Sequence, residues 1–89
     1  MFTKESTPDT VEMIIDMKFL GVVEHVDKVN GNGFILFDIY CGDINADDYD
    51  DMKLVRDFLK EMFKDDKSVA VTTDTTMGYQ CVEVYFYES

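Results

Sequence analysis

Cysteine and histidine are scarce in this sequence, and their scarcity excludes several kinds of site. The two cysteines, Cys41 and Cys81, are too few for a disulfide framework. We expect both to be unbonded thiols in a reducing, cytoplasmic setting. They lack CxxC spacing, and with His25 as the only histidine they make a poor zinc set. We therefore expect neither a metal nor a cofactor.

Long apolar runs are also missing. None approaches the ~20 residues of a membrane-spanning helix, and the opening "MFTKESTPDT" is polar and unlike a signal peptide. The only proline, Pro8, lies in this opening, and we expect residues 1–9 to form a loosely ordered terminus. Because no linker or repeat divides the rest, residues 1–89 are predicted to form a single small domain.

Basic residues are few. Eight Lys and Arg face nineteen Asp and Glu, which gives a net charge of −11. Such a surface repels nucleic-acid phosphates and anionic lipid and attracts basic proteins. The aromatic fraction of 13% is too high for a disordered acidic tail. The sequence therefore predicts a folded acidic domain that binds neither nucleic acid nor membrane directly.

Strand patterns flank one helical pattern. Val11, Met13, Ile15, Met17 and Phe19 alternate, which favours a half-buried strand. A helix capped by Asp9 is the competitor, but its apolar face would next meet Lys18. "VNGNGF" is typical of a tight hairpin turn between residues 22–29 and 34–41.

The helical pattern covers residues 48–65, where apolar residues recur at three and four. Two more strands are predicted at 68–75 and 79–88. The expected fold is α+β: a small antiparallel sheet of about four strands (ββαββ-like), built from residues 11–28, 33–41, 68–75 and 79–88 and covered on one face by a single helix.

The stretch "CGDINADDYDD", residues 41–51, has three readings. As a calcium loop starting at Asp43 it lacks the glycine, where Asp48 stands, and the final carboxylate, where Leu54 stands. As a helix start it explains more, because Asp47 or Asp48 can cap a helix and acids suit its first turn. The excess of acid beyond capping is explained by solubility or by binding.

No catalytic motif is present. "VEHVD" favours His25 as an exposed strand residue rather than a general base. Gly31 and Gly33 belong to a hairpin and not to a phosphate-binding loop, since no helix follows them. We therefore do not expect an enzyme.

The acidic excess lies outside the predicted helix. Residues 50–67 hold five basic and six acidic residues, so they are nearly neutral. Several of the other acids share the sheet face that the helix leaves open, together with apolar and aromatic residues. Clustered aromatics ringed by acids suit a basic partner. The candidate partner-binding residues are Glu12, Asp16, Asp38, Tyr40, Asp43, Asp47, Asp48, Glu83, Tyr85 and Tyr87.

In size, acidity and absence of motifs the chain resembles the small acidic inhibitors made by phages and mobile elements, such as DNA mimics and anti-CRISPR proteins. No aligned stretch carries this resemblance, so it assigns no residues. The sequence predicts an inhibitor that engages a basic nucleic-acid-handling protein by charge mimicry. The alternative is a homodimeric or adaptor domain whose tyrosine-rich sheet face is the interface and whose acidity serves only solubility.

Overall fold

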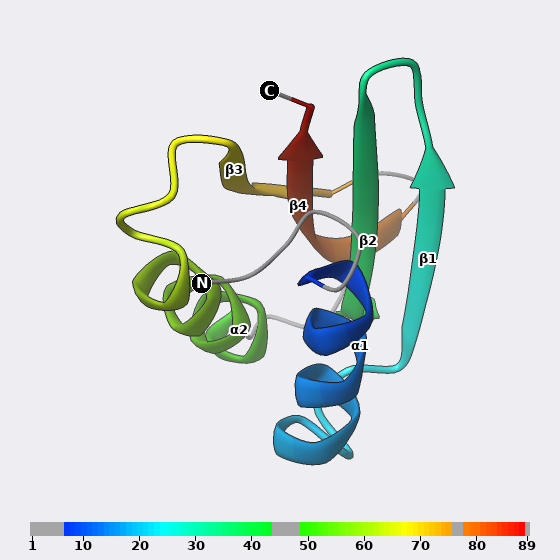
Figure 1. Ribbon diagram of the computed structural model, residues 1–89. Helices are drawn as coiled ribbons and strands as arrows, with labels where there is room; N and C mark the ends of the chain where they lie inside the picture. Colours follow the sequence, from blue (N-terminus) through cyan, green and yellow to red (C-terminus); the bar gives the residue numbers. More distant parts are fainter. Residues whose placement is uncertain (1–6, 44–48, 76–77, 89) are drawn as a thin grey trace.

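Four antiparallel strands and two helices make up the described part of the chain (Figure 1). The computed structural model describes residues 7–43, 49–75 and 78–88. The elements are α1 (Thr7–Lys18), β1 (His25–Asn30), β2 (Phe34–Asp43), α2 (Asp50–Met62), β3 (Val69–Asp74) and β4 (Tyr79–Tyr87). The strand order is β1-β2-β4-β3, and every neighbouring pair is antiparallel. The predicted α+β class with a four-stranded antiparallel sheet is thus confirmed.

The first predicted strand is wrong. Residues 7–18 form α1, and residues 7–9, expected in a loose terminus, are its first turn. Val11, Ile15 and Phe19 are buried, whereas Met13 and Met17 are exposed. An alternating apolar pattern contains a spacing of four residues within it, so it also fits one face of a helix. The expected single helix is therefore replaced by two.

Lys18 does not interrupt the apolar face of α1. Its ammonium lies 4.8 Å from the centre of the Phe58 ring of α2, and Phe19 meets the same ring edge-on at 5.4 Å. A lysine can lay its methylene stem along an apolar surface and keep its charge over an aromatic face. Because of this contact with α2, Lys18 can follow the apolar face of α1 without placing its charge in the core.

The predicted hairpin is confirmed, with β1 starting at His25 rather than residue 22. Val26 pairs with Ile39 and Asn30 with Ile35, in antiparallel register. Gly33 has a φ of +86°, a conformation that glycine adopts without strain. At Gly31 an added Cβ would overlap the far end of the Phe34 ring, so a substitution there would require that ring to move.

The second helix and the last two strands are confirmed with small changes of boundary. α2 buries Met52, Val55 and Leu59 against the sheet. Its N-cap residue is Tyr49, which makes no side-chain capping bond. The predicted capping residues Asp47 and Asp48 lie outside the described residues, while acids do occupy the first turn, as Asp50 and Asp51.

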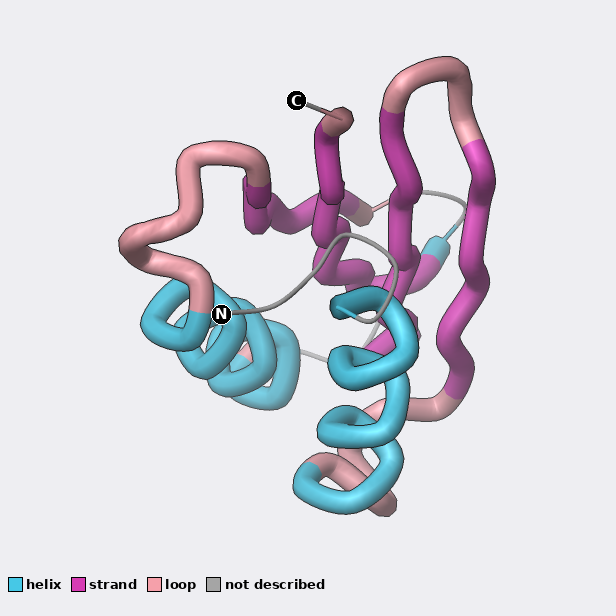
Figure 2. Tube along the Cα trace, viewed as in Figure 1, coloured by secondary structure: helices cyan, strands magenta, loops and turns pink. Residues whose placement is uncertain are grey.

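Both helices pack on the same face of the sheet (Figure 2). The core joins Ile15 of α1 and Leu59 of α2 to Phe37, Ile39 and Val84 of the strands. No described element covers the opposite face. Within the described residues, no helix is long and apolar enough to cross a membrane.

Both thiols are buried and free, as predicted. Cys41 lies on the helix-covered side with Phe37 and Ile39, whereas Cys81 is the register partner of Tyr40 and so lies on the opposite side. Two cysteines on opposite faces of neighbouring strands cannot bond, because their side chains point apart. Burial raises the pKa of Cys41 to about 11 and that of Cys81 to about 12, which leaves both thiols protonated.

Candidate partner-binding face

The sheet face opposite the helices, here called the outer face, is acidic and aromatic. Strand pairing and alternation place its side chains in rows across the four strands. The described residues of the outer face are His25, Asp27 and Val29 of β1; Phe34, Leu36, Asp38 and Tyr40 of β2; Tyr79, Cys81, Glu83, Tyr85 and Tyr87 of β4; and Ala70, Thr72 and Asp74 of β3. None of them is Lys or Arg.

Three carboxylates form a row across the middle of the outer face. Asp27 pairs with Asp38 across β1 and β2, and Asp38 pairs with Glu83 across β2 and β4. Neighbouring strands lie about 4.8 Å apart, so each acid stands beside the next. Like charges directly opposite one another destabilise a sheet. We call Asp27, Asp38 and Glu83 the carboxylate row.

The environments of Asp38 and Glu83 in this row disfavour their charged forms. Partial burial raises the pKa of Asp38, hydrogen bonds with Cys81 and Glu83 lower it, and the nearby carboxylates Asp27 and Asp74 raise it further. Burial also raises the pKa of Glu83, followed by the charge of Asp38. The row is therefore held in the fold at a cost.

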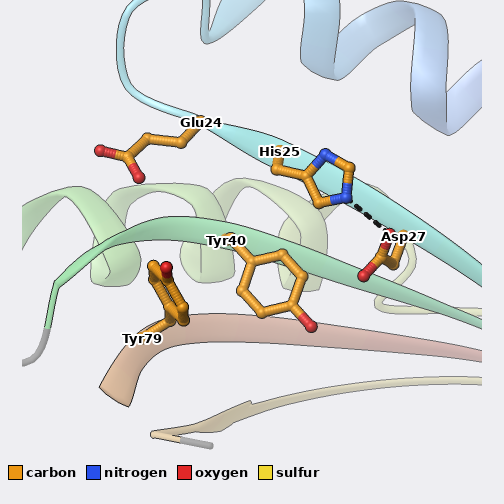
Figure 3. Close-up of a pocket in the computed structure, with 5 residues that line it drawn as sticks. All are labelled: Glu24, His25, Asp27, Tyr40 and Tyr79. Atoms are coloured by element: carbon orange, nitrogen blue, oxygen red, sulfur yellow. Dashed lines mark hydrogen bonds and ion pairs between the residues drawn. The ribbon is translucent and has the colours of Figure 1, made fainter. Parts of the chain in front are cut away.

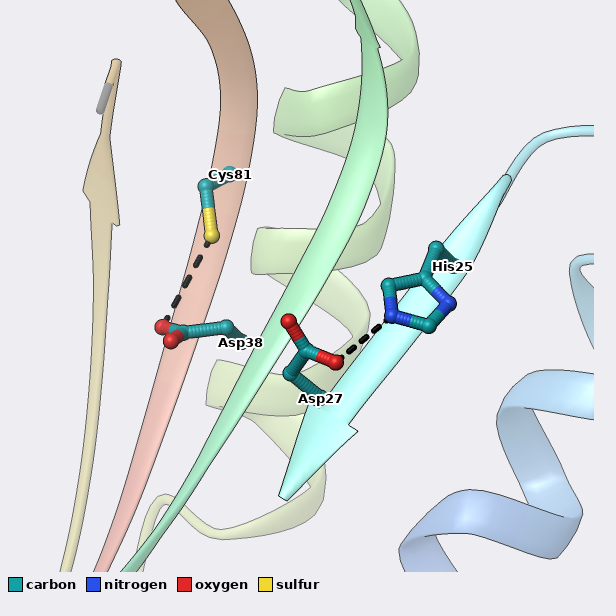
Figure 4. Close-up of polar contacts among 4 residues, drawn as sticks. All are labelled: His25, Asp27, Asp38 and Cys81. Atoms are coloured by element: carbon teal, nitrogen blue, oxygen red, sulfur yellow. Dashed lines mark hydrogen bonds and ion pairs between the residues drawn. The ribbon is translucent and has the colours of Figure 1, made fainter. Parts of the chain in front are cut away.

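Two neighbouring groups partly offset this cost. The Cys81 thiol donates to Asp38 Oδ1 at 3.8 Å (Figure 4), and the Tyr85 hydroxyl donates to Glu83 Oε2 at 3.3 Å. Each of these bonds favours the charged form of the carboxyl that accepts it, and each lowers the corresponding pKa. In both acids burial outweighs this effect, because it is the largest contribution and the net pKa is raised.

Neutralising the centre of the row is expected to stabilise the fold. A raised carboxyl pKa means that the folded state holds more protons than the unfolded state, so stability falls as pH rises from the ordinary values of 3.8 and 4.5 through the raised ones. Asp38→Asn removes this loss. We expect a gain of about 0.2–1 kcal/mol at pH 7 that shrinks to almost nothing below about pH 4.

Urea unfolding of Asp38→Asn and the unmodified protein at both pH values measures this effect. Asp57→Asn on α2 is the control, because Asp57 already accepts a hydrogen bond from Arg56 Nε at 2.9 Å. A loss of stability in Asp38→Asn at pH 7 would contradict the like-charge account.

Aromatic clusters lie on the two sides of the carboxylate row, along the direction of the strands. On one side Tyr40 meets Tyr79 edge-on, with 5.6 Å between the ring centres. On the other side Tyr85 and Tyr87 stack 5.7 Å apart and nearly parallel, and Phe34 lies against both. Tyr79 and Tyr87 each keep 45% of their surface exposed. Ring faces are thus available to a partner on either side of the acids.

A pocket opens beside the first cluster (Figure 3). It has a volume of about 470 Å³ and is lined by Glu24, His25, Asp27, Tyr40 and Tyr79. His25 Nε2 lies 2.6 Å from Asp27 Oδ1, and the imidazole stacks on Tyr40. The His25 side chain is 63% exposed, as predicted for an exposed strand residue.

The structure brings together half of the predicted site. Asp38, Tyr40, Glu83, Tyr85 and Tyr87 share the outer face. The other two residues that can be placed lie elsewhere: Glu12 and Asp16 are exposed on α1, because the strand predicted to carry them is a helix. Asp47, Asp48 and the side chain of Asp43, which ends β2, fall outside what the structure describes.

Several residues of the face were not named as site residues, among them His25, Asp27, Tyr79 and Cys81. The signal for Asp27 was available, because the turn in "VNGNGF" sets a hairpin register that puts Asp27 opposite Asp38. Alternation along residues 79–88 also puts Tyr79 and Cys81 on the side of Glu83. Which residues of β2 they lie beside depends on how β4 pairs with β2, and no local pattern reveals that pairing.

The described residues contain no group of three or more His, Cys, Asp or Glu side chains arranged to hold a metal ion. Comparison with known proteins finds no matching family model, no matching curated protein and no matching solved structure.

Proposed function

We propose that this protein is a binding inhibitor that covers a basic surface of a nucleic-acid-handling protein with its outer face and catalyses no reaction. The observation that carries the proposal is the carboxylate row, which lies between two aromatic clusters on a sheet face that no described element covers and whose described residues include no Lys or Arg. Because the carboxylate row lowers the stability of the fold, a role in binding a partner explains its presence.

A basic partner suits this face in two ways. Arg or Lys of a partner, placed over the row, would offset the repulsion among Asp27, Asp38 and Glu83. The repulsion that destabilises the free protein would therefore be relieved on binding, which would favour the complex. Exposed ring faces at Tyr79 and Tyr87 would add cation–π contacts. Aromatic residues and charged pairs of this kind are common among binding hot spots.

Charge mimicry follows from the spacing. Each strand of the outer face carries one acid, and the acids of β1, β2 and β4 stand side by side at the strand spacing of about 4.8 Å. This surface density of negative charge suits a groove that accepts a phosphate backbone. The proposal therefore places the protein in competition with nucleic acid for a basic groove.

A homodimer through the outer face is the second candidate, and the same charges count against it. A two-fold axis would bring the carboxylate row of one copy against the identical row of the other. Like-charge juxtaposition across an interface costs several kcal/mol. The tyrosines alone would favour such a dimer, but the acids between them do not.

Competition with DNA tests the proposal. A fluorescent DNA duplex is bound to an arginine-rich peptide, and this protein is titrated in at rising salt. We expect release of the duplex at low salt and a steep loss of that effect as salt rises. Failure to release the duplex at low salt, together with a dimer in sedimentation that salt does not dissociate, would support the homodimer instead.

A further inference from the structure

We infer that the pocket lined by Glu24, His25, Asp27, Tyr40 and Tyr79 receives one arginine side chain of the partner. The inference rests on the proposed function, because it assumes a basic partner on the outer face. It goes further by naming the chemical group and the place where that group is held.

The pocket has the walls that a flat cation needs. The rings of Tyr40 and Tyr79 stand at 77° to each other, so they form two adjoining sides of a cage. The carboxylates of Glu24 and Asp27 lie toward opposite ends, with Tyr40 between them (Figure 3). A cation inside this cage would meet ring faces and carboxylate oxygens together.

His25 fixes one of these walls. Its ring stacks on Tyr40 with 5.8 Å between the centres, and its Nε2 lies 2.6 Å from Asp27 Oδ1. The Asp27 carboxylate also accepts a hydrogen bond from the Tyr40 hydroxyl, so His25 and Tyr40 together fix its position, and a cation would share it with them (Figures 3 and 4). His25 is thus a positioning residue for the carboxylate that would receive the cation.

The chemistry of the lining selects arginine among possible occupants. Two carboxylates repel an anion, and a neutral ligand would displace water from them without supplying an opposite charge. A guanidinium is planar, is weakly hydrated, stacks on rings and donates several hydrogen bonds in its plane. A lysine ammonium is compact and strongly hydrated, so it gains less from two ring faces. The volume of about 470 Å³ also admits the longer, forked side chain.

Peptides of identical length test the inference. One carries arginine, one lysine and one citrulline, which keeps the shape of arginine but not its charge, and binding is measured by calorimetry. We expect the arginine peptide to bind about 3- to 10-fold more tightly than the lysine peptide. Tyr79→Ala should reduce this ratio to nearly one, and the amide signals of residues 24–27 and 79 should shift most on binding.

Tyr87→Ala is the matched control. Tyr87 is exposed to the same 45% as Tyr79 and lies on the same strand, on the opposite side of the carboxylate row. Its removal should lower affinity for all cationic peptides but leave the ratio of arginine to lysine unchanged. Circular dichroism confirms that both variants remain folded.

The outcomes separate this inference from the proposed function. If the unmodified protein binds both cationic peptides in a salt-dependent way but keeps its preference for arginine in Tyr79→Ala, or shows no preference at all, the pocket assignment is wrong and the basic partner stands. If neither cationic peptide binds at low salt, the proposed function is wrong, and the pocket assignment falls with it. Equal binding of citrulline and arginine would also overturn the assignment.

Discussion

Replacing Asp38 and Glu83 together by lysine is expected to reduce binding to a basic partner by about 100-fold or more. The two acids are register partners at the centre of the outer face. Reversal would place two cations against a basic surface, and repulsion across an interface costs several kcal/mol. The fold should be as stable as before or slightly more stable, because one new lysine would stand opposite Asp27.

The measurement is the association rate with the arginine-rich peptide at low salt. Surface charges act mainly on that rate, so the loss should appear there first and should resemble the effect of added salt. The control is the pair Asp57→Lys and Glu61→Lys, which changes the net charge by the same amount on the exposed side of α2. Those acids already contact Arg56 and Lys64, each at 2.9 Å.

Comparing the two double variants distinguishes binding at the outer face from attraction by net charge alone. A loss confined to Asp38 and Glu83 supports the outer face as the site. Equal losses in both pairs would mean that net charge alone attracts the peptide, and solubility would then be the better account of the acids.

Ile15→Ala is expected to cost about 2–5 kcal/mol of stability, the largest effect in α1. Ile15 is 1% exposed and belongs to the core that joins the two helices to the sheet. Truncation of so buried a side chain loses transfer free energy and leaves a cavity. For a domain of this size, each kcal/mol lowers the melting temperature by roughly 4–8 °C.

Met17→Ala is the informative partner of this experiment. As a strand, residues 11–19 would place Ile15 and Met17 on the same buried face, and both truncations would be costly. In α1 Met17 is 78% exposed, so its truncation should change stability by less than about 0.5 kcal/mol. Comparable losses in both variants, measured by thermal unfolding, would contradict the helix.

An acidic and aromatic sheet face was predictable from the sequence, but only some of its residues were. Asp38, Tyr40, Glu83, Tyr85 and Tyr87 could be assigned to one face because alternation along a strand is a local property. Their arrangement as a row could not, since it depends on which strands are neighbours. The order β1-β2-β4-β3 brings Asp38 and Glu83 together from distant parts of the chain.

Local signals were enough to predict the hairpin turn, β2, β3, β4 and α2, because glycine-rich turns and strong periodicity act within a few residues of chain. The hairpin register also puts Asp27 opposite Asp38. Tertiary contacts were needed to assign α1. Its apolar spacing fits a strand as well as a helix, and the choice lies in contacts with α2, where the Phe58 ring contacts Phe19 and Lys18. The tertiary structure also placed Glu12 and Asp16 on a helix away from the outer face and set Asp38 beside Glu83. Pairing between β2 and β4 is non-local, so the charge pattern of the site is set by the sheet rather than by any single segment.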